Sequence, residues 1–316
     1  MPPRLGGVPL YLSEDDVESL LTPADAVEAV EGSFQRLAEG LVDNRPRYRL
    51  GLEHGQLAVM AAVDHGLEVA GLKTYAAGSG GASFVFVLFD AASQQLLAVI
   101  EADRLGRLRT GAASAVAARH LAKDGAASLG VLGCGWQAEM QVACIRAVLP
   151  ELSGTVAYCR TRERLEEFCR REGATPADSP RDAAEQDIVV TMTTSRDPVV
   201  RGEWLRPGAL VCAAGANRPE ARELDNAVLE RAAFVCCDSK EDARIESGDL
   251  IEPVEQGVLD WLEVHELAEV VTGQVAGRQS DEDIVVFKSN GIAAWDVAVG
   301  ALAVARARER GVGREL

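Results

Sequence analysis

One hexapeptide constrains the fold of this chain of 316 residues more than any other feature. Residues 133–138 read GCGWQA, directly after a short apolar run and directly before a helical stretch from about Trp136 to Val148. The pattern GxGxxA between a strand and a helix is typical of the phosphate-binding turn of a dinucleotide fold. An ordinary glycine corner is the alternative, but the flanking strand and helix favour the nucleotide-binding turn.

Each residue of this turn has a physical role in the nucleotide hypothesis. Gly133 permits the tight turn, Gly135 lets a pyrophosphate approach the backbone, and Ala138 packs the helix against the strand. The helix N-terminus adds N–H groups and a positive dipole end, which favour phosphate. We therefore expect the following residues to bind the cofactor: Gly133, Gly135, Trp136, Gln137 and Ala138.

Strand-like and helical stretches alternate on both sides of this turn. The apolar runs GTVAYCR, DIVVTMT, ALVCAAG and AAFVCCD are separated by helical stretches such as TRERLEEFCRREG. Such alternation favours βαβ units and a parallel sheet. Residues 123–290 are therefore predicted to form a Rossmann dinucleotide-binding domain.

Residues 1–122 show a different pattern. Ser13 and Thr22 are expected to cap two helices. Short runs rich in β-formers predict successive strands of one sheet, at 45–52, 57–63, 68–75, 83–90 and 95–101. A long alanine-rich helix is expected at 103–122, and another at 291–310. The fold class is therefore α/β, a Rossmann domain joined to an α+β domain.

The overall charge excludes several classes of partner. Asp and Glu outnumber Lys and Arg by 49 to 32, which gives a net charge of −17. Such a surface repels nucleic acid and anionic lipid, although a local arginine cluster can still bind a small anion. No apolar run approaches ~18 residues, and the N-terminus lacks a signal-peptide core, so a cytoplasmic protein is expected. The seven cysteines are expected to be reduced, and the four histidines form no metal-ligand pattern.

The end of the second Rossmann strand bears on the choice of cofactor. An acidic residue usually binds the ribose 2′-hydroxyl of NAD there, whereas this chain has Cys159, Arg160 and Thr161. A guanidinium and a hydroxyl suit a 2′-phosphate. We therefore expect NADP(H) to be preferred, with NAD(H) possible. The alternative is that Arg160 is only a solvated charge at the start of a helix.

Several charged residues in the first third need an explanation. Lys73 lies within an apolar strand, where a lysine requires a partner or a function. Arg45, Arg47 and Arg49 alternate along one predicted strand and are expected to share one face. For Arg45 and Arg49 in particular, a role in offsetting surface charge is an equal alternative.

Two further positions suggest ligand contact. Arg109-Thr110-Gly111 lies in the alanine-rich helix, where glycine costs ~1 kcal/mol relative to alanine and so indicates a close approach by another chain or by a ligand. Asp225 follows an apolar strand and a loop, and ligands of open α/β sheets bind outside the carboxyl ends of strands. A helix N-cap is the alternative reading of Asp225.

Taken together, these stretches resemble the ornithine cyclodeaminase/mu-crystallin family over almost the whole chain. The matching segments are GLK at 71–73, LFDAASQQLLAVIEADRLGRLRTGAASAVAARHLA, VLGCGWQA, GANRPEARELD, CDSKEDARIESGDL and VFKSNGIAAWDVA. The resemblance implies a homodimer. It also implies a substrate-binding and dimerisation domain of residues 1–122, completed by the C-terminal helix at 291–316.

The resemblance also implies roles for individual residues. Arg47, Lys73 and Arg109 correspond to the residues that bind an α-carboxylate. Asp225 corresponds to the proton-transfer residue, and with Lys73 it forms the expected catalytic set. The remaining expected cofactor contacts are Thr110 near the phosphates, and Ser289 and Asn290 near the nicotinamide.

The family's chemistry is diverse, and Arg160 and Thr161 favour one branch. Net reduction draws on NADPH, so the expected activity is an NADPH-dependent reductase of an α-imino acid or cyclic ketimine carboxylate, reversible as an amino-acid dehydrogenase. One alternative is an ornithine cyclodeaminase that recycles NAD. Another is a small-ligand-binding protein of the mu-crystallin type.

Overall fold

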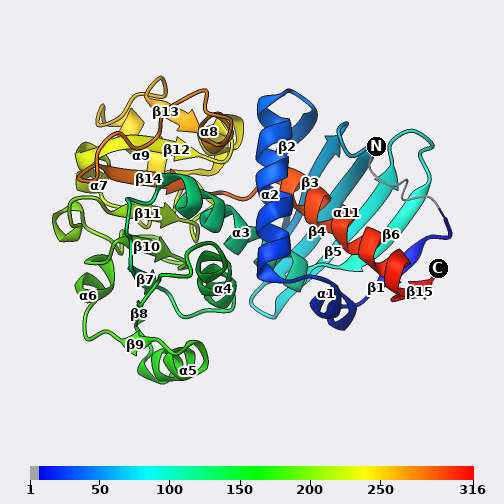
Figure 1. Ribbon diagram of the computed structural model, residues 1–316, viewed down its shortest axis with the longest axis horizontal. Helices are drawn as coiled ribbons and strands as arrows, with labels where there is room; N and C mark the ends of the chain where they lie inside the picture. The colour runs from blue at the N-terminus through cyan, green and yellow to red at the C-terminus, as the bar shows by residue number, and fades with distance from the viewer. Residues whose placement is uncertain (1–6) are drawn as a thin grey trace. The chain divides into compact units, whose positions relative to one another are not determined.

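The computed structural model describes residues 7–316, which form two compact units (Figure 1). Unit 1 is the chain up to Arg109 together with Ile292–Leu316, and unit 2 is Thr110–Gly291. The boundary expected after residue 122 lies instead within helix α3 (Asp103–Leu121). The C-terminal part of α3 belongs to unit 2 because it packs against that unit's helix α4 (Ala138–Val148): a Cβ at Gly111 would lie 2.2 Å from the carbonyl oxygen of Met140.

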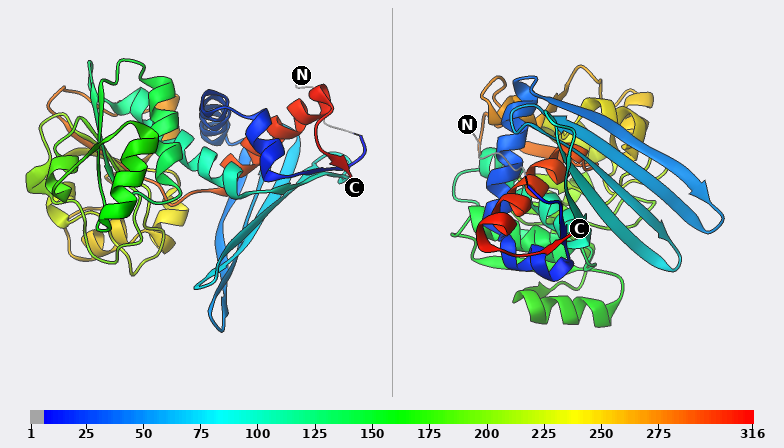
Figure 2. Two further views of the ribbon diagram at one scale, coloured as in Figure 1. Left: turned by 90° about the horizontal axis from the view of Figure 1, so that it is seen from below. Right: turned by 90° about the vertical axis from the view of Figure 1, so that its right-hand side faces the viewer.

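Unit 1 is a seven-stranded sheet with helices on one face. The sheet order is β15-β1-β6-β5-β4-β3-β2, antiparallel except for the parallel pair β1 and β6. The strands are β1 (Leu10–Leu12), β2 (Val42–Leu52), β3 (Gly55–Asp64), β4 (Val69–Gly78), β5 (Gly81–Asp90), β6 (Leu96–Glu101) and β15 (Arg314–Glu315). The helices are α1 (Glu14–Leu20), α2 (Pro23–Ala38) and α11 (Ala293–Arg310). Figure 2 shows the long hairpins of β2 to β5 extending past these helices.

The alternation of side chains along the strands decides which face is covered. In β3, Ala58, Met60 and Ala62 are buried on the side of α11, while the residues between them remain partly accessible. The two N-terminal helices begin where expected, since Ser13 and Thr22 each form a capping box with the acidic residue three positions on.

The three arginines of β2 do not share one face, contrary to the prediction from alternation. The pairing with β3 shifts between Arg45 and Tyr48, so two residues of β2 oppose one residue of β3. This β-bulge changes the face of every later side chain. Arg45 is consequently exposed beside Asp43, whereas Arg47 is buried.

Unit 2 is the expected Rossmann domain, with eight parallel strands in the order β13-β12-β14-β11-β10-β7-β8-β9. Its strands are β7 (Ser128–Leu132), β8 (Gly154–Tyr158), β9 (Thr175–Pro176), β10 (Ile188–Thr191), β11 (Leu210–Ala213), β12 (Ala232–Cys237), β13 (Val264–Glu266) and β14 (Ile284–Lys288). Besides α4, its helices are α5 (Arg162–Glu172), α6 (Pro180–Ala184), η1 (Gly202–Trp204), α7 (Asn226–Arg231), α8 (Lys240–Glu246), α9 (Gly248–Glu255) and α10 (Leu267–Val271).

The strand order of unit 2 has a functional consequence. The chain runs outward from β7 to β9 on one side and returns to β10 on the other, so the direction of winding reverses between β7 and β10. Open α/β sheets bind ligands at such a switch point, beyond the carboxyl ends of the strands. The seven cysteines carry free thiols. No helix within residues 7–316 is both long and apolar enough to cross a bilayer.

Candidate cofactor and substrate sites

The glycine turn after β7 has the geometry that its sequence predicts. Gly133 has a φ of +105°, and a Cβ there would lie 2.3 Å from the carbonyl oxygen of Met192. A Cβ at Gly135 would meet nothing within 4 Å, so that backbone faces open space that a phosphate can enter. The helix α4 starts at Ala138, two residues later than expected, with Trp136 and Gln137 in the preceding turn.

A cavity of about 500 Å³ lies at the switch point of unit 2. Segments that follow β7, β8 and β10 line it, among them Gly133, Gly135, Arg160 and Thr161. This places four of the predicted cofactor residues together. The other predicted contacts, which are Thr110, Trp136, Gln137, Ala138, Ser289 and Asn290, do not line this cavity.

The charge of this cavity is opposite to that of the whole protein. Arg160, Arg164 and Arg201 contribute to its lining, and none of the described lining residues is acidic. Because the chain carries a net charge of −17, such a local excess of guanidinium groups marks a site for an anion. Arginine binds phosphate oxygens with a planar fork of N–H donors. The residues present therefore fit a phosphorylated dinucleotide.

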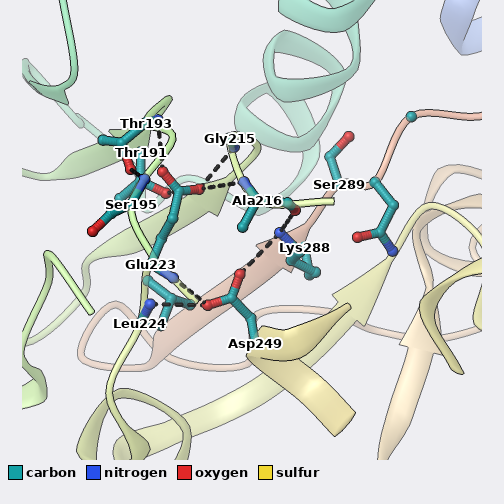
Figure 3. Close-up of polar contacts among 12 residues, drawn as sticks. Thr191, Thr193, Ser195, Gly215, Ala216, Glu223, Leu224, Asp249, Lys288 and Ser289 are labelled. Carbon is teal, nitrogen blue, oxygen red and sulfur yellow. Dashed lines mark hydrogen bonds and ion pairs between the residues drawn. The ribbon is translucent and has the colours of Figure 1, made fainter. Parts of the chain in front are cut away.

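A buried carboxylate, Glu223, ties together the loops that follow β10 and β11 (Figure 3). One of its oxygens accepts hydrogen bonds from the Gly215 and Ala216 amides, at 2.7 and 3.0 Å, and from the Thr191 hydroxyl. The other accepts the Thr193 amide at 2.7 Å. Burial raises the pKa of Glu223. Glu223 thereby fixes backbone at the carboxyl ends of the strands, beside the cavity.

Lys288 at the end of β14 extends this network (Figure 3). Its fully buried ammonium pairs with Asp249 at 2.9 Å and donates to the carbonyl oxygen of Ala216 at 2.5 Å. Asp249 in turn accepts the backbone N–H groups of Glu223 and Leu224. The network anchors residues 223–225, which read ELD, to the end of the sheet.

The Ser289-Asn290 loop is fixed by another buried carboxylate. Asp238, at the end of β12, accepts the amides of Asn290 and Gly291 at 2.7 and 2.6 Å and the hydroxyl of Ser289. Burial raises the pKa of Asp238, and these backbone hydrogen bonds oppose the shift. The loop that was expected near the nicotinamide is thus held rigidly at the carboxyl end of β14.

Asp225 is the N-cap of helix α7, which is the alternative that the sequence analysis gave for it. Its Oδ1 accepts the amide of Val228 in the first turn of α7 and the amide of Gly202 at 2.9 Å. Both hydrogen bonds go to the same oxygen. Asp225 is only half-buried and does not line the arginine-rich cavity.

Unit 1 holds a second charged site, which we name the Lys73 cluster: Arg47, Lys73, Arg109 and Asp296. Lys73 lies on the covered face of β4, between Met60 and Phe86 of the neighbouring strands. Its Nζ is 3.0 Å from Oδ1 of Asp296, and Nε of Arg109 lies 3.3 Å from the same oxygen. All four side chains are buried. Two of the three cations, Lys73 and Arg109, therefore share one carboxylate oxygen, and the charge of Arg47 also acts on Lys73.

Burial lowers the pKa of Lys73 to about 8, and the charges of Arg109 and Arg47 add to this shift while Asp296 opposes it. Aromatic rings complete the surroundings. Lys73 Nζ lies 5.4 Å from the centre of the Phe84 ring, and the Arg109 guanidinium lies 5.7 Å from that of Trp295. A buried site that gathers three cationic side chains beside aromatic rings is suited to the carboxylate of a small organic acid.

Sequence reasoning found three members of the Lys73 cluster and missed Asp296. It also missed the buried charges of unit 2, Glu223, Asp238, Asp249 and Lys288. A usable signal was present, because Asp296 is the lone acidic residue between Ala293 and Val304, in an otherwise apolar segment. A buried acid in such a segment needs a cationic partner.

The chain is similar to known proteins over almost its whole length. The family model for the ornithine cyclodeaminase/mu-crystallin family matches residues 8–311. The chain belongs to this family. Within it, the chain is 34% identical to alanine dehydrogenase of Archaeoglobus fulgidus, over 97% of this chain and 98% of the relative.

Solved structures of this family have the same fold. One is a Thermococcus litoralis Δ1-pyrroline-2-carboxylate reductase in complex with NADH and L-proline, with a TM-score of 0.91, 31% identity, and coverage of 97% of this chain and 100% of that one. Another is an archaeal alanine dehydrogenase dimer with bound NAD, with a TM-score of 0.92, 32% identity, and coverage of 98% and 99%.

Proposed function

We propose that this family member is an NADPH-dependent reductase of an α-imino acid or cyclic ketimine carboxylate, formally reversible as an amino-acid dehydrogenase. The observation that carries the proposal is the Lys73 cluster, in which the buried Lys73 and Arg109 share one oxygen of Asp296 and the charge of the buried Arg47 acts on Lys73. Such a cluster is stabilised by one further negative charge, which the substrate's carboxylate supplies. The relatives support the reaction class, since they include a pyrroline-2-carboxylate reductase and an alanine dehydrogenase.

The arginine-rich cavity supports the cofactor. Gly133 and Gly135 would admit the pyrophosphate, and Arg160, Arg164 and Thr161 would hold the 2′-phosphate of NADPH. When bound, the reduced nicotinamide supplies the hydride that reduces the C=N carbon. The solved relatives carry NADH or NAD. The proposed preference for NADP(H) therefore rests on this chain's own Arg160, Arg164 and Thr161.

The substrate carboxylate would be bound by Arg47, Lys73 and Arg109. Two guanidinium groups fix the plane of a carboxylate through forked hydrogen bonds, and the ammonium adds a point charge. Fixing that group orients the neighbouring C=N carbon, which converts an encounter into an oriented, unimolecular step. Trp295 and Phe84 limit the access of water to these charges.

The substrate nitrogen must carry a proton, because an iminium accepts hydride far better than a neutral imine. Asp225 is the proposed proton donor, since Oδ1 makes the capping bonds and Oδ2 has no part in them. Lys73, whose pKa is lowered to about 8, is a second candidate for the proton transfer. The balanced reaction consumes one NADPH and one proton for each C=N bond converted to CH–NH.

The homodimer is also a proposal. Apolar side chains cover the face of the unit 1 sheet that lies opposite α11, including Val59, Ala61, Leu72 and Val87. Tyr48, beyond the bulge, is 63% exposed on the same face. A partly accessible apolar sheet face favours burial against a second copy, and the solved archaeal relative is a dimer. Light scattering after size-exclusion chromatography measures the assembled mass.

The test of the function is a titration with NADPH and NADH, followed by turnover of Δ1-pyrroline-2-carboxylate and other cyclic ketimine carboxylates. We expect NADPH to bind more tightly. Arg160→Ala and Arg164→Ala should each weaken NADPH about 10–100-fold and leave NADH unchanged, since a charge-assisted hydrogen bond contributes about 1.5–3 kcal/mol.

The matched control is Arg170→Ala, an exposed arginine of α5 that does not line the cavity. It should leave both cofactors unaffected. Tight NADH binding, with ammonia released from ornithine when no cofactor is added, would instead identify a cyclodeaminase. Tight NADPH binding without turnover of any imino acid would identify a binding protein.

A further inference from the structure

The buried acid of helix α11, Asp296, belongs to the Lys73 cluster, but the proposed function gives it no part in substrate binding or catalysis. Its side chain is fully buried, among the apolar residues of α11. Burying a carboxylate is costly unless cations and hydrogen bonds compensate it. A purely apolar residue would pack this helix against the sheet at lower cost. The presence of Asp296 therefore points to a function beyond packing.

The partners of Asp296 distinguish it from the other buried acids. Its Oδ1 accepts from Lys73 Nζ and from Arg109 Nε, and its buried Oδ2 accepts no hydrogen bond from residues 7–316. By contrast, Asp249 and Asp238 each accept backbone amides and hold loops in place. The described bonds of Asp296 go only to two side chains that are proposed to bind substrate.

Its effect on Lys73 follows from electrostatics. Burial disfavours the ammonium form of Lys73, and the charges of Arg109 and Arg47 disfavour it further. Asp296 is the first of the opposing influences, through its charge and its hydrogen bond. An opposite charge at this range shifts a pKa by about 1–3 units. Removing Asp296 would therefore shift Lys73 towards the neutral amine.

We propose that Asp296 is a positioning residue of the substrate site: it keeps Lys73 in the ammonium form and aims Lys73 and Arg109 at the substrate carboxylate. One oxygen that holds both cations also fixes their separation. The inference rests on the proposed function, because it assigns Asp296 to the binding of an imino-acid carboxylate. It adds a residue from the last helix of the chain to a site built from β2, β4 and α3.

Asp296→Asn tests the proposal through the titration of Lys73. The chain has only four lysines. Competitive acetylation with trace acetic anhydride, followed by mass spectrometry, therefore measures the reactivity of each lysine separately as a function of pH. In the wild type, Lys73 should become reactive with a midpoint near 8. In Asp296→Asn that midpoint should fall by about 1–3 units, while that of Lys123 stays unchanged.

Kinetics provide the second readout. In Asp296→Asn the substrate KM should rise about tenfold or more at pH 8 and recover as the pH is lowered, because protonation restores the Lys73 charge. The value of kcat should change much less. Asp296→Glu restores the charge and should return the pH profile towards that of the wild type.

The matched control is Asp64→Asn. Asp64 is another fully buried acid of unit 1, paired with Arg36 at 2.8 Å and remote from the proposed chemistry. It should lower stability without moving the Lys73 midpoint or the pH profile. If Asp296→Asn does not fold, Asp296→Ser serves as a smaller uncharged replacement with the same expected shift.

Two outcomes would overturn the proposal. One is an unchanged Lys73 midpoint in a folded, uncharged Asp296 variant. The other is a loss of stability with KM raised equally at every pH, which is the signature of a merely structural acid. The acetylation needs no substrate, so it decides the charge effect of Asp296 even if no imino acid is turned over. Failure of the proposed function is therefore distinguishable from failure of this inference.

Discussion

The ammonium group of Lys73 lies directly against Gly106 of α3, where a Cβ would come within 2.3 Å of Nζ. Gly106 is buried inside a helix, a position where glycine costs ~1 kcal/mol relative to alanine. The missing side chain leaves the space that Lys73 occupies. Helix α3 thus contributes to the proposed substrate site both through Arg109 and through the absence of a methyl group one turn earlier.

Gly106→Ala should therefore damage substrate binding rather than folding. The methyl group displaces the Lys73 ammonium from Asp296, so we expect KM for the imino acid to rise about tenfold or more. Helix propensity gains ~1 kcal/mol, which offsets part of the overpacking cost of about 1–3 kcal/mol. Steady-state kinetics and thermal unfolding check both parts.

Gly111→Ala, five residues along the same helix, provides the contrast. Its Cβ would lie 2.2 Å from a backbone carbonyl oxygen, that of Met140, which cannot move aside as a side chain does. This variant should lose stability. Equal effects of the two substitutions on KM would contradict the specific role of Gly106.

Asp225→Asn separates the capping role of Asp225 from its proposed chemistry. Asparagine is as good an N-cap as aspartate, so the free energy of unfolding should change by less than about 1 kcal/mol. Turnover should fall about 10²–10⁴-fold, because the amide cannot supply the proton. The measurement is kcat at saturating imino acid beside a denaturation curve. Near-normal kcat would leave Asp225 as a helix cap and make Lys73 the remaining candidate donor.

Arg109→Lys should weaken carboxylate binding. Lysine replaces a planar fork of donors with a point charge and loses the stacking of the guanidinium over Trp295. We expect KM to rise about 10–100-fold, the equivalent of losing about 1.5–3 kcal/mol from a charge-assisted hydrogen bond. The control is Arg104→Lys, also in α3, whose partner is the exposed Glu18. An unchanged KM would remove Arg109 from the carboxylate site.

Substrate affinity should fall as the pH rises through about 8, where Lys73 loses its proton. The sign follows from the lowered pKa: below this value Lys73 is charged and attracts the carboxylate, and above it Lys73 is neutral. One unit above the midpoint, about a tenth of the enzyme keeps the charge, so KM should rise up to about tenfold. In Lys73→Met, KM should no longer rise with pH through this range. If the rise in KM persists in that variant, another group causes it.

The same titration affects stability in the opposite sense. Because the pKa of Lys73 is lowered from 10.5 to about 8 on folding, the unfolded chain binds more protons between these values. Stability should therefore gain from this group as the pH rises through that window. Denaturant unfolding of the wild type and of Lys73→Met at several pH values separates this contribution from the other titrating groups.

Much of the fold follows from local patterns in the sequence. The strands of unit 1 are bounded by turns, and the alternation from β7 onward is regular, so periodicity alone places these elements to within a few residues. Lys73 also followed from local reasoning, since a charge in an apolar strand needs compensation. These features depend on neighbours in the sequence.

The features that the sequence did not predict depend on contacts between distant segments. Asp296 is 223 residues from Lys73 along the chain, so no local pattern links them. The bulge near Pro46, where proline has no N–H to donate to the ladder, reversed the faces of the later arginines. The insertion of β14 between β11 and β12 is likewise a property of the assembled sheet.

Unit 1 is discontinuous, and this affects how it is made. The helix that covers its sheet and carries Asp296, α11, is translated about 180 residues after Arg109. At about 5–20 residues per second, the ribosome needs roughly 10–40 s to deliver it. During that interval the nascent sheet lacks the helix that contacts β2 to β6 on its covered face. The proposed substrate site then has its cations without the Asp296 carboxylate. The proposed substrate site can therefore be completed only after unit 2 has been synthesised, so the chain's last helix is the final element that the site needs.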